Sequence, residues 1–293
     1  MTEAEQDERS WADGKMLSSR KGPVGIMTFN HPERLNAVSM EMWEAMGEIM
    51  AGFGADDSIR VIVLRGAGDK AFVSGGDISQ FAKTRASAAV ARQHTARIAV
   101  GRNAVANCAK PTIACIRGFC LGGGLAIAVQ ADLRIAATGS QFGIPAARLG
   151  VAYGFEGLRT LVDLVGPAHA RMIMYAAERI DAAEAARIGL INRVLEPDAL
   201  WPHVMALAER IADNAPISIS AAKDGIAQVL RDPGDRDLPR LHLHGRTGHP
   251  VHLVQEEHLT LGQRGQDRGQ VAGVLDRRAT GDPDGAARAR RRR

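Results

Sequence analysis

The chain of 293 residues is long enough for one large domain or two small ones, and its 45% hydrophobic content is ordinary for a folded protein. Aromatic residues make up only 4%, so the core must be mainly aliphatic. No run of 18 apolar residues occurs, and the first residues are polar and acidic. The sequence therefore predicts neither a membrane span nor a targeting leader.

The net charge of +4 belongs to the end of the chain. Residues 231–293 hold 13 of the 37 Lys and Arg and 9 of the 33 Asp and Glu, which leaves 24 of each sign elsewhere. A neutral body does not predict nucleic-acid binding, which needs a basic face on the folded domain. The three cysteines, Cys108, Cys115 and Cys120, lack metal-ligand spacing, so they indicate buried thiols in a reducing cytoplasm and no metal site.

Strand and helix patterns alternate along the first half of the chain. The predicted elements are a disordered segment at 1–14, a hairpin at 15–30, a helix from a Ser39 cap to about residue 53, a strand at 59–64 and an Ala-rich helix at 86–109. The hairpin depends on a Gly22-Pro23 turn. The run at 59–64 is continuously apolar, which is typical of a strand covered on both faces.

The second half is richer in helices. Its predicted elements are strands at 112–116, 132–137 and 190–195, an irregular site-lining segment at 141–153, and helices at 155–165, 168–177, 198–213 and beyond Pro216. A short helix is also predicted at 181–188, with Asp181 as its cap. The alternation predicts right-handed crossovers and an α/β core. We divide the chain into a core at 15–195, a helical region at 196–230 and a tail at 231–293.

The composition of the tail differs sharply from the rest. It contains no Lys, Ile, Phe, Tyr, Trp, Met, Cys, Ser or Asn, and it holds five of the nine histidines. Three interpretations compete: a disordered tail, a metal-binding histidine tract, and a changed reading frame. The histidine spacing matches no known ligand pattern, and the loss of so many residue types at one boundary favours a changed frame or a recently acquired tail.

Two glycine-rich breaks interrupt the core. Gly122-Gly123-Gly124 separates a β-rich run from an apolar helix, and Gly75-Gly76 follows another short strand. Glycines at a helix start leave backbone N–H groups bare, with partial positive charge and no Cβ in front of them. If each break presents one N–H to the same oxygen, the pair forms an oxyanion hole. The alternative is a pair of turns that serve only to pack strand on helix.

Five motifs occur in order over residues 15–230: HPERLNAVS, KAFVSGGDI, GFCLGGGLAIAVQADLRIAA, FGIPAARLG and DAAEAARIGLINRVL. Together they resemble the enoyl-CoA hydratase/isomerase, or crotonase, superfamily. The resemblance implies an α/β fold with a crotonase-like ββα spiral core and a helical C-terminal region, assembled as a homotrimer or hexamer. It also implies a cytoplasmic enzyme of fatty acid metabolism that takes an acyl-CoA substrate. Coenzyme A would enter only as part of that substrate, without another cofactor or a membrane partner.

The resemblance implies roles for particular residues of this sequence. The motif positions of the two oxyanion-hole N–H groups are Gly76 and Gly123. The residues expected to contact coenzyme A belong to the first two motifs. They are Arg34, Leu35, Asn36, Ala37, Ser74, Asp77 and Ile78. The basic residue that often follows the second motif is Ser79 here.

The resemblance fails at the acid and base positions. Hydratases of the superfamily use two glutamates, and this chain has Ala126 and Ala146 in their places. Members with isomerase or dehalogenase roles use a carboxylate where this chain has Gly154. Water addition by paired carboxylates is therefore not predicted. The polar residues left nearby, Tyr153 and Glu156, are the candidates for moving a proton.

Three functions stay open. The first is a lyase or isomerase that acts on an acyl-CoA through an enolate held by Gly76 and Gly123. The second is an acyl-CoA decarboxylase that uses Tyr153, and the third is a non-catalytic acyl-CoA-binding relative that keeps the oxyanion hole. Tyr153 could instead be a packing residue and Glu156 a partner of the helix dipole. Arg148 could steer an acidic acyl group or a phosphate, or simply be solvated.

Overall fold

The computed structural model describes residues 5–77 and 88–230, apart from the side chains of residues 88–94 and 156. The chain divides into two compact units, Met1–Leu238 and Pro239–Arg293, and every described residue belongs to the first unit. The predictions made for the tail at 231–293 lie outside the described residues. None of the described helices combines the length and hydrophobicity that a membrane crossing requires.

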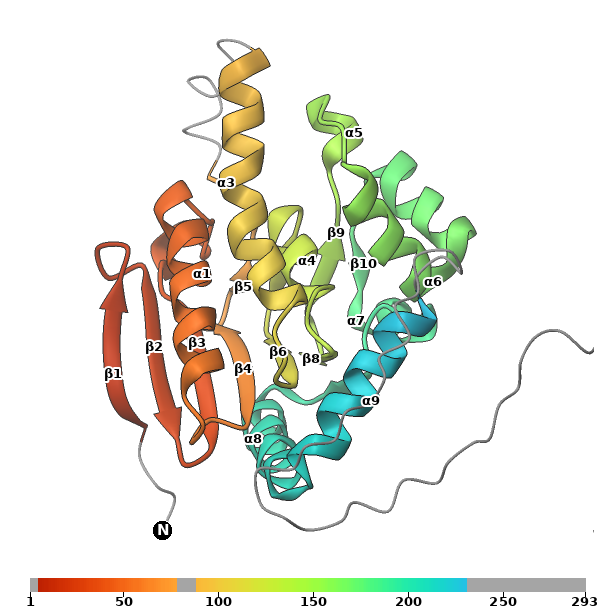
Figure 1. The fold of residues 1–293 in the computed structure, drawn as a ribbon. Helices are drawn as coiled ribbons and strands as arrows, with labels where there is room; N and C mark the ends of the chain where they lie inside the picture. The colour runs from red at the N-terminus through yellow and green to blue at the C-terminus, as the bar shows by residue number, and fades with distance from the viewer. Residues whose placement is uncertain (1–4, 78–87, 231–293) are drawn as a thin grey trace, which may run out of the picture. The chain divides into compact units, whose positions relative to one another are not determined.

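A seven-stranded sheet forms the centre of this unit (Figure 1). In spatial order its strands are β1 (Gln6–Trp11), β2 (Met16–Lys21), β3 (Val24–Phe29), β4 (Val61–Gly66), β6 (Thr112–Ile116), β8 (Leu133–Ala137) and β11 (Arg193–Leu195). The first three strands are antiparallel, which confirms the predicted hairpin, and the pairs from β3 onward are parallel. The prediction that residues 1–14 are disordered is wrong for β1, because this exposed polar strand pairs its backbone with β2.

A second sheet has the order β10 (Ile180–Asp181), β9 (Gln141–Gly143), β7 (Phe119–Leu121) and β5 (Ala71–Val73). Along the chain, β5, β7 and β9 directly follow β4, β6 and β8 of the large sheet, and a helix comes next each time among the described elements. This repetition is the ββα pattern that the resemblance to the superfamily implies. The prediction of an irregular segment at 141–153 is wrong in part, since it contains β9 and the short helix α5 (Ala146–Leu149).

The remaining helical elements are η1 (Pro32–Arg34), α1 (Met40–Ala55), α3 (Ala88–Ala106), α4 (Gly123–Ala128), α6 (Phe155–Ala176), α7 (Ala182–Arg187), α8 (Pro197–Asp213) and α9 (Pro216–Val229). Two predicted caps are confirmed: the Ser39 hydroxyl accepts the Met42 N–H at 3.4 Å, and the Asp181 carboxylate accepts the Glu184 N–H at 2.8 Å. The helices predicted at 155–165 and 168–177 are confirmed as two parts of α6, which Gly166 separates with a non-helical φ of 72° and ψ of 164°.

Apolar layers cover both faces of the large sheet. Along β4, Ile62 and Leu64 belong to the layer beneath α1 and α3, while Val61 and Val63 belong to the layer beneath α8. All four side chains are fully buried, so the strand is covered on both faces as its continuous apolar run predicts. Helices α1 and α3 lie side by side on the first face (Figure 1).

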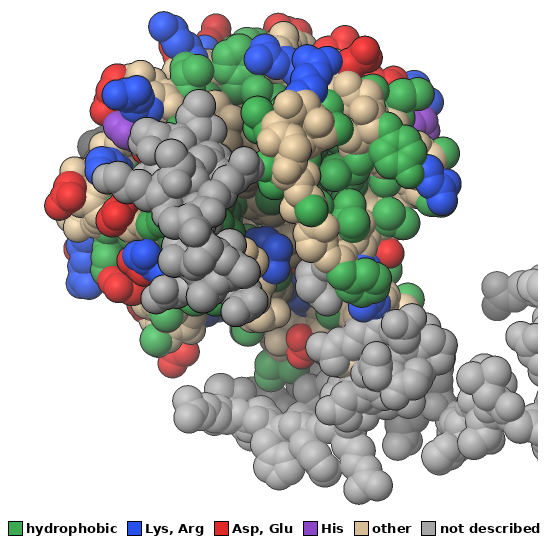
Figure 2. All heavy atoms as spheres, turned by 90° about the horizontal axis from the view of Figure 1, so that it is seen from above, with side chains coloured by type: hydrophobic (Ala, Val, Ile, Leu, Met, Phe, Trp, Pro, Cys, Tyr) green, Lys and Arg blue, Asp and Glu red, His purple; other side chains and the backbone are tan. Residues whose placement is uncertain are grey.

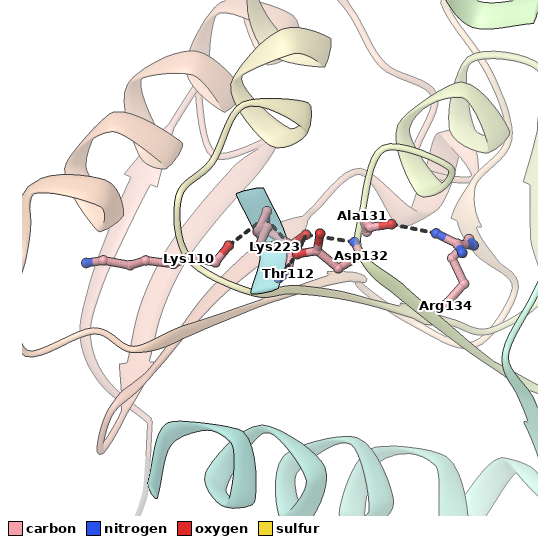
Figure 3. A network of polar contacts seen from close by, with 6 residues as sticks. All are labelled: Lys110, Thr112, Ala131, Asp132, Arg134 and Lys223. Carbon is pink, nitrogen blue, oxygen red and sulfur yellow. Dashed lines mark hydrogen bonds and ion pairs between the residues drawn. The ribbon is translucent and has the colours of Figure 1, made fainter. Parts of the chain in front are cut away.

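A polar network joins the beginnings of β6 and β8 (Figure 3). One carboxylate oxygen of Asp132 accepts the Thr112 N–H at 2.8 Å and the Thr112 hydroxyl at 2.9 Å. From α9, the Lys223 ammonium group reaches the same oxygen at 2.7 Å and the Lys110 carbonyl oxygen at 3.0 Å. These bonds join α9, none of whose residues is buried, to the residues that precede β6 and β8.

Candidate active site

The structure brings the two glycine-rich breaks into contact. A Cβ atom placed on Gly123 would lie only 3.3 Å from the amide nitrogen of Gly76. A Cβ atom on Gly122 would lie 4.0 Å from the Cα atom of Gly75. Two turns that are distant in the sequence thus form the two sides of one narrow space.

The Gly76 amide faces away from Val38, its partner in an isolated parallel bridge. The Val38 N–H donates to the Gly75 carbonyl oxygen at 2.9 Å, and the Val38 carbonyl oxygen accepts the Asp77 N–H at 3.0 Å. In such a parallel bridge the residue between the two bonded groups turns its own N–H to the opposite side. Among the described residues, neither the Gly76 N–H nor the Gly123 N–H has a backbone acceptor.

A different structural feature accounts for the glycine at each of positions 122, 123 and 124. Gly122 makes the turn, with a φ of 50° that favours glycine, and its N–H donates to the Gly143 carbonyl oxygen at 2.8 Å. Gly123 opens α4, where the first N–H groups have no intrahelical acceptor. Gly124 packs against β5, since a Cβ atom there would lie 2.1 Å from the Val73 carbonyl oxygen. Only Gly123 points its missing side chain at the space beside Gly76.

The segments expected to contact coenzyme A lie next to this space. The Ser74 N–H donates to the Leu35 carbonyl oxygen at 3.1 Å, so the two motifs are joined through their backbones. Arg34 is exposed on η1, and Ala37 is partly buried beside Val38. Asp77 ends the bridge to Val38. Ile78 and Ser79 lie outside the described residues.

Asn36 has a structural role in this loop. Its side chain is fully buried, accepts the His31 N–H at 2.9 Å and donates to the carbonyl oxygens of Ala67 and Ala71 at 3.0 and 2.8 Å. These bonds use both N–H donors of the amide group within the protein. The buried Asn36 side chain therefore holds the loop in place.

The alanines at the expected glutamate positions also lie near the glycines. Ala126 is in the first turn of α4, where its N–H donates to the Gly122 carbonyl oxygen at 3.0 Å. Ala146 is buried and follows Pro145, whose Cδ atom would lie 3.8 Å from a Cβ atom on Gly122. A methyl group therefore stands at each position, and neither can hold or transfer a proton.

Tyr153 lies between α5 and α6 and packs against the main core. Burial raises the pKa of its phenol to about 12, although the positive charge of Arg102 on α3 acts in the opposite direction. At neutral pH the group is therefore an uncharged hydrogen-bond donor and a poor base. Glu156 lies in the first turn of α6, and its side chain is outside the described part of the chain.

Trp43 of α1 is a site residue that the sequence analysis missed. Its indole Cζ2 atom would lie 3.7 Å from a Cβ atom on Gly123, and the residue is buried. The ring therefore forms an apolar wall beside the glycines. An aromatic residue on the buried face of an amphipathic helix resembles any other core residue, so no local signal could have singled it out.

A separate cavity of about 330 Å³ lies on the opposite face of the large sheet, under α8. Arg65 lines this cavity, but its guanidinium already pairs with Glu5 at 2.9 Å and stacks on the Trp201 ring at 4.5 Å. No cluster of three or more His, Cys, Asp or Glu that could hold a metal ion occurs within the described ranges. The glycine site thus remains the better candidate, because the Gly76 and Gly123 N–H groups have no backbone acceptor in the described part of the chain.

Comparison with known proteins gives one consistent result. Residues 19–244 match the family model described as enoyl-CoA hydratase/isomerase. A short-chain-enoyl-CoA hydratase of Clostridium acetobutylicum is 34% identical over 221 residues, which cover 74% of this chain and 82% of that protein. A crotonyl-CoA hydratase of Syntrophomonas wolfei is 32% identical, covering 76% and 85%.

Solved structures agree with these matches. The crystal structure of an enoyl-CoA hydratase/carnithine racemase from Magnetospirillum magneticum has a TM-score of 0.72 and 38% sequence identity, and the match covers 73% of this chain and 80% of that one. The α/β architecture described above is thus the crotonase fold. The chain belongs to the enoyl-CoA hydratase/isomerase family.

Proposed function

We propose that this chain is a lyase or isomerase of acyl-CoA thioesters, in which the N–H groups of Gly76 and Gly123 hold the thioester oxygen as it becomes an enolate. The observation that carries the proposal is the contact between the two glycine breaks, with both N–H groups lacking an acceptor among the described residues. A proton next to a thioester is only weakly acidic, so the reaction depends on stabilising that oxygen. One preorganised donor of this kind typically contributes about 10²–10³ in rate.

Proton transfer in this proposal does not use a glutamate pair. Ala126 and Ala146 leave the usual acid and base positions without a carboxylate, although the named relatives are hydratases. Tyr153 and Glu156 are the candidates that remain in the adjoining segment. Because burial keeps the Tyr153 phenol protonated, we assign it hydrogen-bond donation to substrate and leave proton abstraction to Glu156.

A second candidate function is decarboxylation of an acyl-CoA that carries a carboxylate next to the thioester. It is favoured by the same neutral Tyr153 phenol, which can donate to that carboxylate and orient it. The enolate left by loss of CO2 would use the same two glycine amides. A third candidate is acyl-CoA binding without turnover.

A panel of assays on the full chain separates these candidates. The first-choice function predicts exchange of the α-protons of butyryl-CoA for deuterium, followed by proton NMR. Release of CO2 from methylmalonyl-CoA that is abolished in Tyr153→Phe would instead support decarboxylation. Binding of butyryl-CoA with no reaction in either assay would leave only the binding function. Hydration of crotonyl-CoA at rates usual for a hydratase would contradict the interpretation that Ala126 and Ala146 leave the chain without the acid and base needed for water addition.

We also propose that the chain self-associates as a trimer or a dimer of trimers. Large apolar side chains are exposed on α5 and α6, namely Leu149, Phe155, Met172 and Tyr175, with exposed fractions of 53–74%. Figure 2 shows hydrophobic side chains gathered on the right of its view, the side on which α6 lies in Figure 1. Apolar surface of this kind is typical of an interface. Sedimentation equilibrium of the full chain gives the test, and a monomer at micromolar concentration would contradict it.

A further inference from the structure

The loop between β3 and α1 contains two consecutive residues with left-handed backbone angles. Leu35 and Asn36 have φ angles of 53° and 55°. Asparagine is among the residue types other than glycine that adopt such angles most readily. For any residue but glycine these angles cost free energy and persist only where the surrounding structure determines them. The hydrogen bonds of the buried Asn36 side chain supply such constraints.

The Asn36 amide group joins three strands near the point where the chain leaves or enters them. The His31 N–H that it accepts follows β3, the Ala67 carbonyl oxygen follows β4, and the Ala71 carbonyl oxygen belongs to the first residue of β5. The packing there is tight, since a Cβ atom on Gly66 would lie 2.8 Å from the Asn36 Nδ2 atom. An amide supplies both the acceptor and the two donors that these groups need, whereas an ionised carboxylate of the same shape has no donor.

The Gly75-Gly76 break is attached to this loop on both sides of Gly76. Before it, the Val38 N–H donates to the Gly75 carbonyl oxygen at 2.9 Å, and after it, the Val38 carbonyl oxygen accepts the Asp77 N–H at 3.0 Å. The break also continues β5, whose first carbonyl oxygen accepts from Asn36 at 2.8 Å. The place of the Gly76 amide is thus determined from two directions, the loop and the strand, and Asn36 holds both.

We propose that Asn36 is a positioning residue of the oxyanion hole, whose side chain sets where the Gly76 N–H lies relative to the Gly123 N–H. It acts through its loop and through β5, because the side chain itself is fully buried. The inference rests on the proposed acyl-CoA function, since the two donors must converge on one thioester oxygen. They come from separate segments of the chain, so each must be held in place independently. A displacement of about 1 Å in such a group can cost about 10² in rate.

Exchange of the α-protons of butyryl-CoA by the full chain tests the proposal, measured at saturating ester so that rate is separated from affinity. Asn36→Gly removes all three side-chain bonds, while glycine readily adopts the φ of 55°. We expect the saturated rate to fall about 10- to 100-fold. The infrared carbonyl stretch of bound butyryl-CoA should return part of the way to its value in water. A side chain that only contacts coenzyme A would change the dissociation constant and leave the saturated rate and the carbonyl stretch unaltered.

Thr112→Val is the matched control. Thr112 is also a fully buried polar residue, and the change removes the bonds of its hydroxyl group to Asp132 at the beginning of β6. We expect it to lower the unfolding midpoint while the saturated exchange rate and the carbonyl stretch keep their wild-type values. If Asn36→Gly is not folded, Asn36→Ser replaces it, because a serine hydroxyl can still donate one hydrogen bond.

Three results would count against the inference. A folded Asn36 variant with the wild-type saturated rate and carbonyl stretch would overturn it alone. An equal loss of rate in Thr112→Val would do the same, because a general loss of stability would then explain both variants. A wild-type chain that binds butyryl-CoA but neither exchanges its α-protons nor shifts its carbonyl stretch would overturn the proposed function as well.

Discussion

Helix α4 begins at Gly123 with an amide that has no acceptor among the described residues, and the chain leaves it through Ala131 and Asp132, where the polar groups are paired. At the exit, Asp132 binds Thr112 and Lys223, and the Arg134 guanidinium donates to the Ala131 carbonyl oxygen (Figure 3). Buried polar groups that stabilise a fold are normally satisfied in this way. Donors left open at a rigid helix start are instead suited to a ligand. The polar groups after α4 thus stabilise the fold, whereas the amide at its start is free to bind a ligand.

The largest expected effect comes from adding a methyl group at the glycine that packs α4 on β5. Gly124→Ala would place a Cβ atom 2.1 Å from the Val73 carbonyl oxygen, which forces backbone to move. We expect a loss of more than about 3 kcal/mol in the free energy of unfolding, measured by urea denaturation. Gly52→Ala, where a Cβ atom meets nothing within 4 Å, is the control and should not destabilise. A Gly124→Ala protein as stable as this control would show that α4 and β5 are not in close contact.

The same substitution one residue earlier should act on function and not on stability. A Cβ atom at Gly123 lies 3.3 Å from the Gly76 nitrogen and would occupy the space assigned to the thioester oxygen. We expect Gly123→Ala to slow α-proton exchange of butyryl-CoA by about 10²–10³, with little change in the unfolding midpoint. Gly76→Ala, whose Cβ atom meets nothing within 4 Å, should slow it much less. Wild-type exchange rates in Gly123→Ala would remove this space from the mechanism.

A moderate effect on stability alone is expected at the exit of α4. Lys223→Met removes the bonds from α9 to the Asp132 carboxylate and to the Lys110 carbonyl oxygen. We expect a loss of about 1 kcal/mol in the free energy of unfolding and no change in acyl-CoA affinity. Arg187→Met, which breaks the exposed pair with Glu184, should have no measurable effect on either. A loss of acyl-CoA affinity in Lys223→Met would mean that the two ends of α4 are coupled.

The smallest expected effect is in the pH dependence. Burial raises the pKa of Tyr153 to about 12, so the phenol keeps its proton in the folded protein until pH approaches that value. The ratio of wild-type to Tyr153→Phe exchange rates should therefore stay constant from about pH 6 to about pH 10. A ratio that falls with a midpoint at or below about pH 10 would show that the phenol ionises as in water and is not enclosed.

Local signals explain which parts of the fold were predictable. The Gly22-Pro23 hairpin, the Ser39 and Asp181 caps and the doubly covered strand β4 follow from turn chemistry, capping and hydrophobic pattern, and the structure confirms them. Strand β1 has no such signal, because its stability comes from backbone pairing with β2 and its side chains are exposed.

The site was predictable to a similar extent. The glycine breaks are visible in the sequence as departures from strand and helix patterns, so Gly76 and Gly123 could be singled out. Trp43 could not, because it lies on an ordinary helix and its place beside the site comes only from what the fold puts opposite it. The buried amide of Asn36 shows the converse, since the side chain of a motif residue expected at the ligand holds its own loop.

The polarisation of a bound thioester tests the central proposal most directly. Butyryl-CoA labelled with ¹³C at the carbonyl can be followed by difference infrared spectroscopy with the full chain, because the carbonyl stretch falls in frequency as donors draw charge onto the oxygen. Two amides from Gly76 and Gly123 predict a frequency below that of the same thioester in water, and a return toward the water value in Gly123→Ala. A bound thioester whose frequency equals that in water would contradict an oxyanion hole between the two glycine breaks.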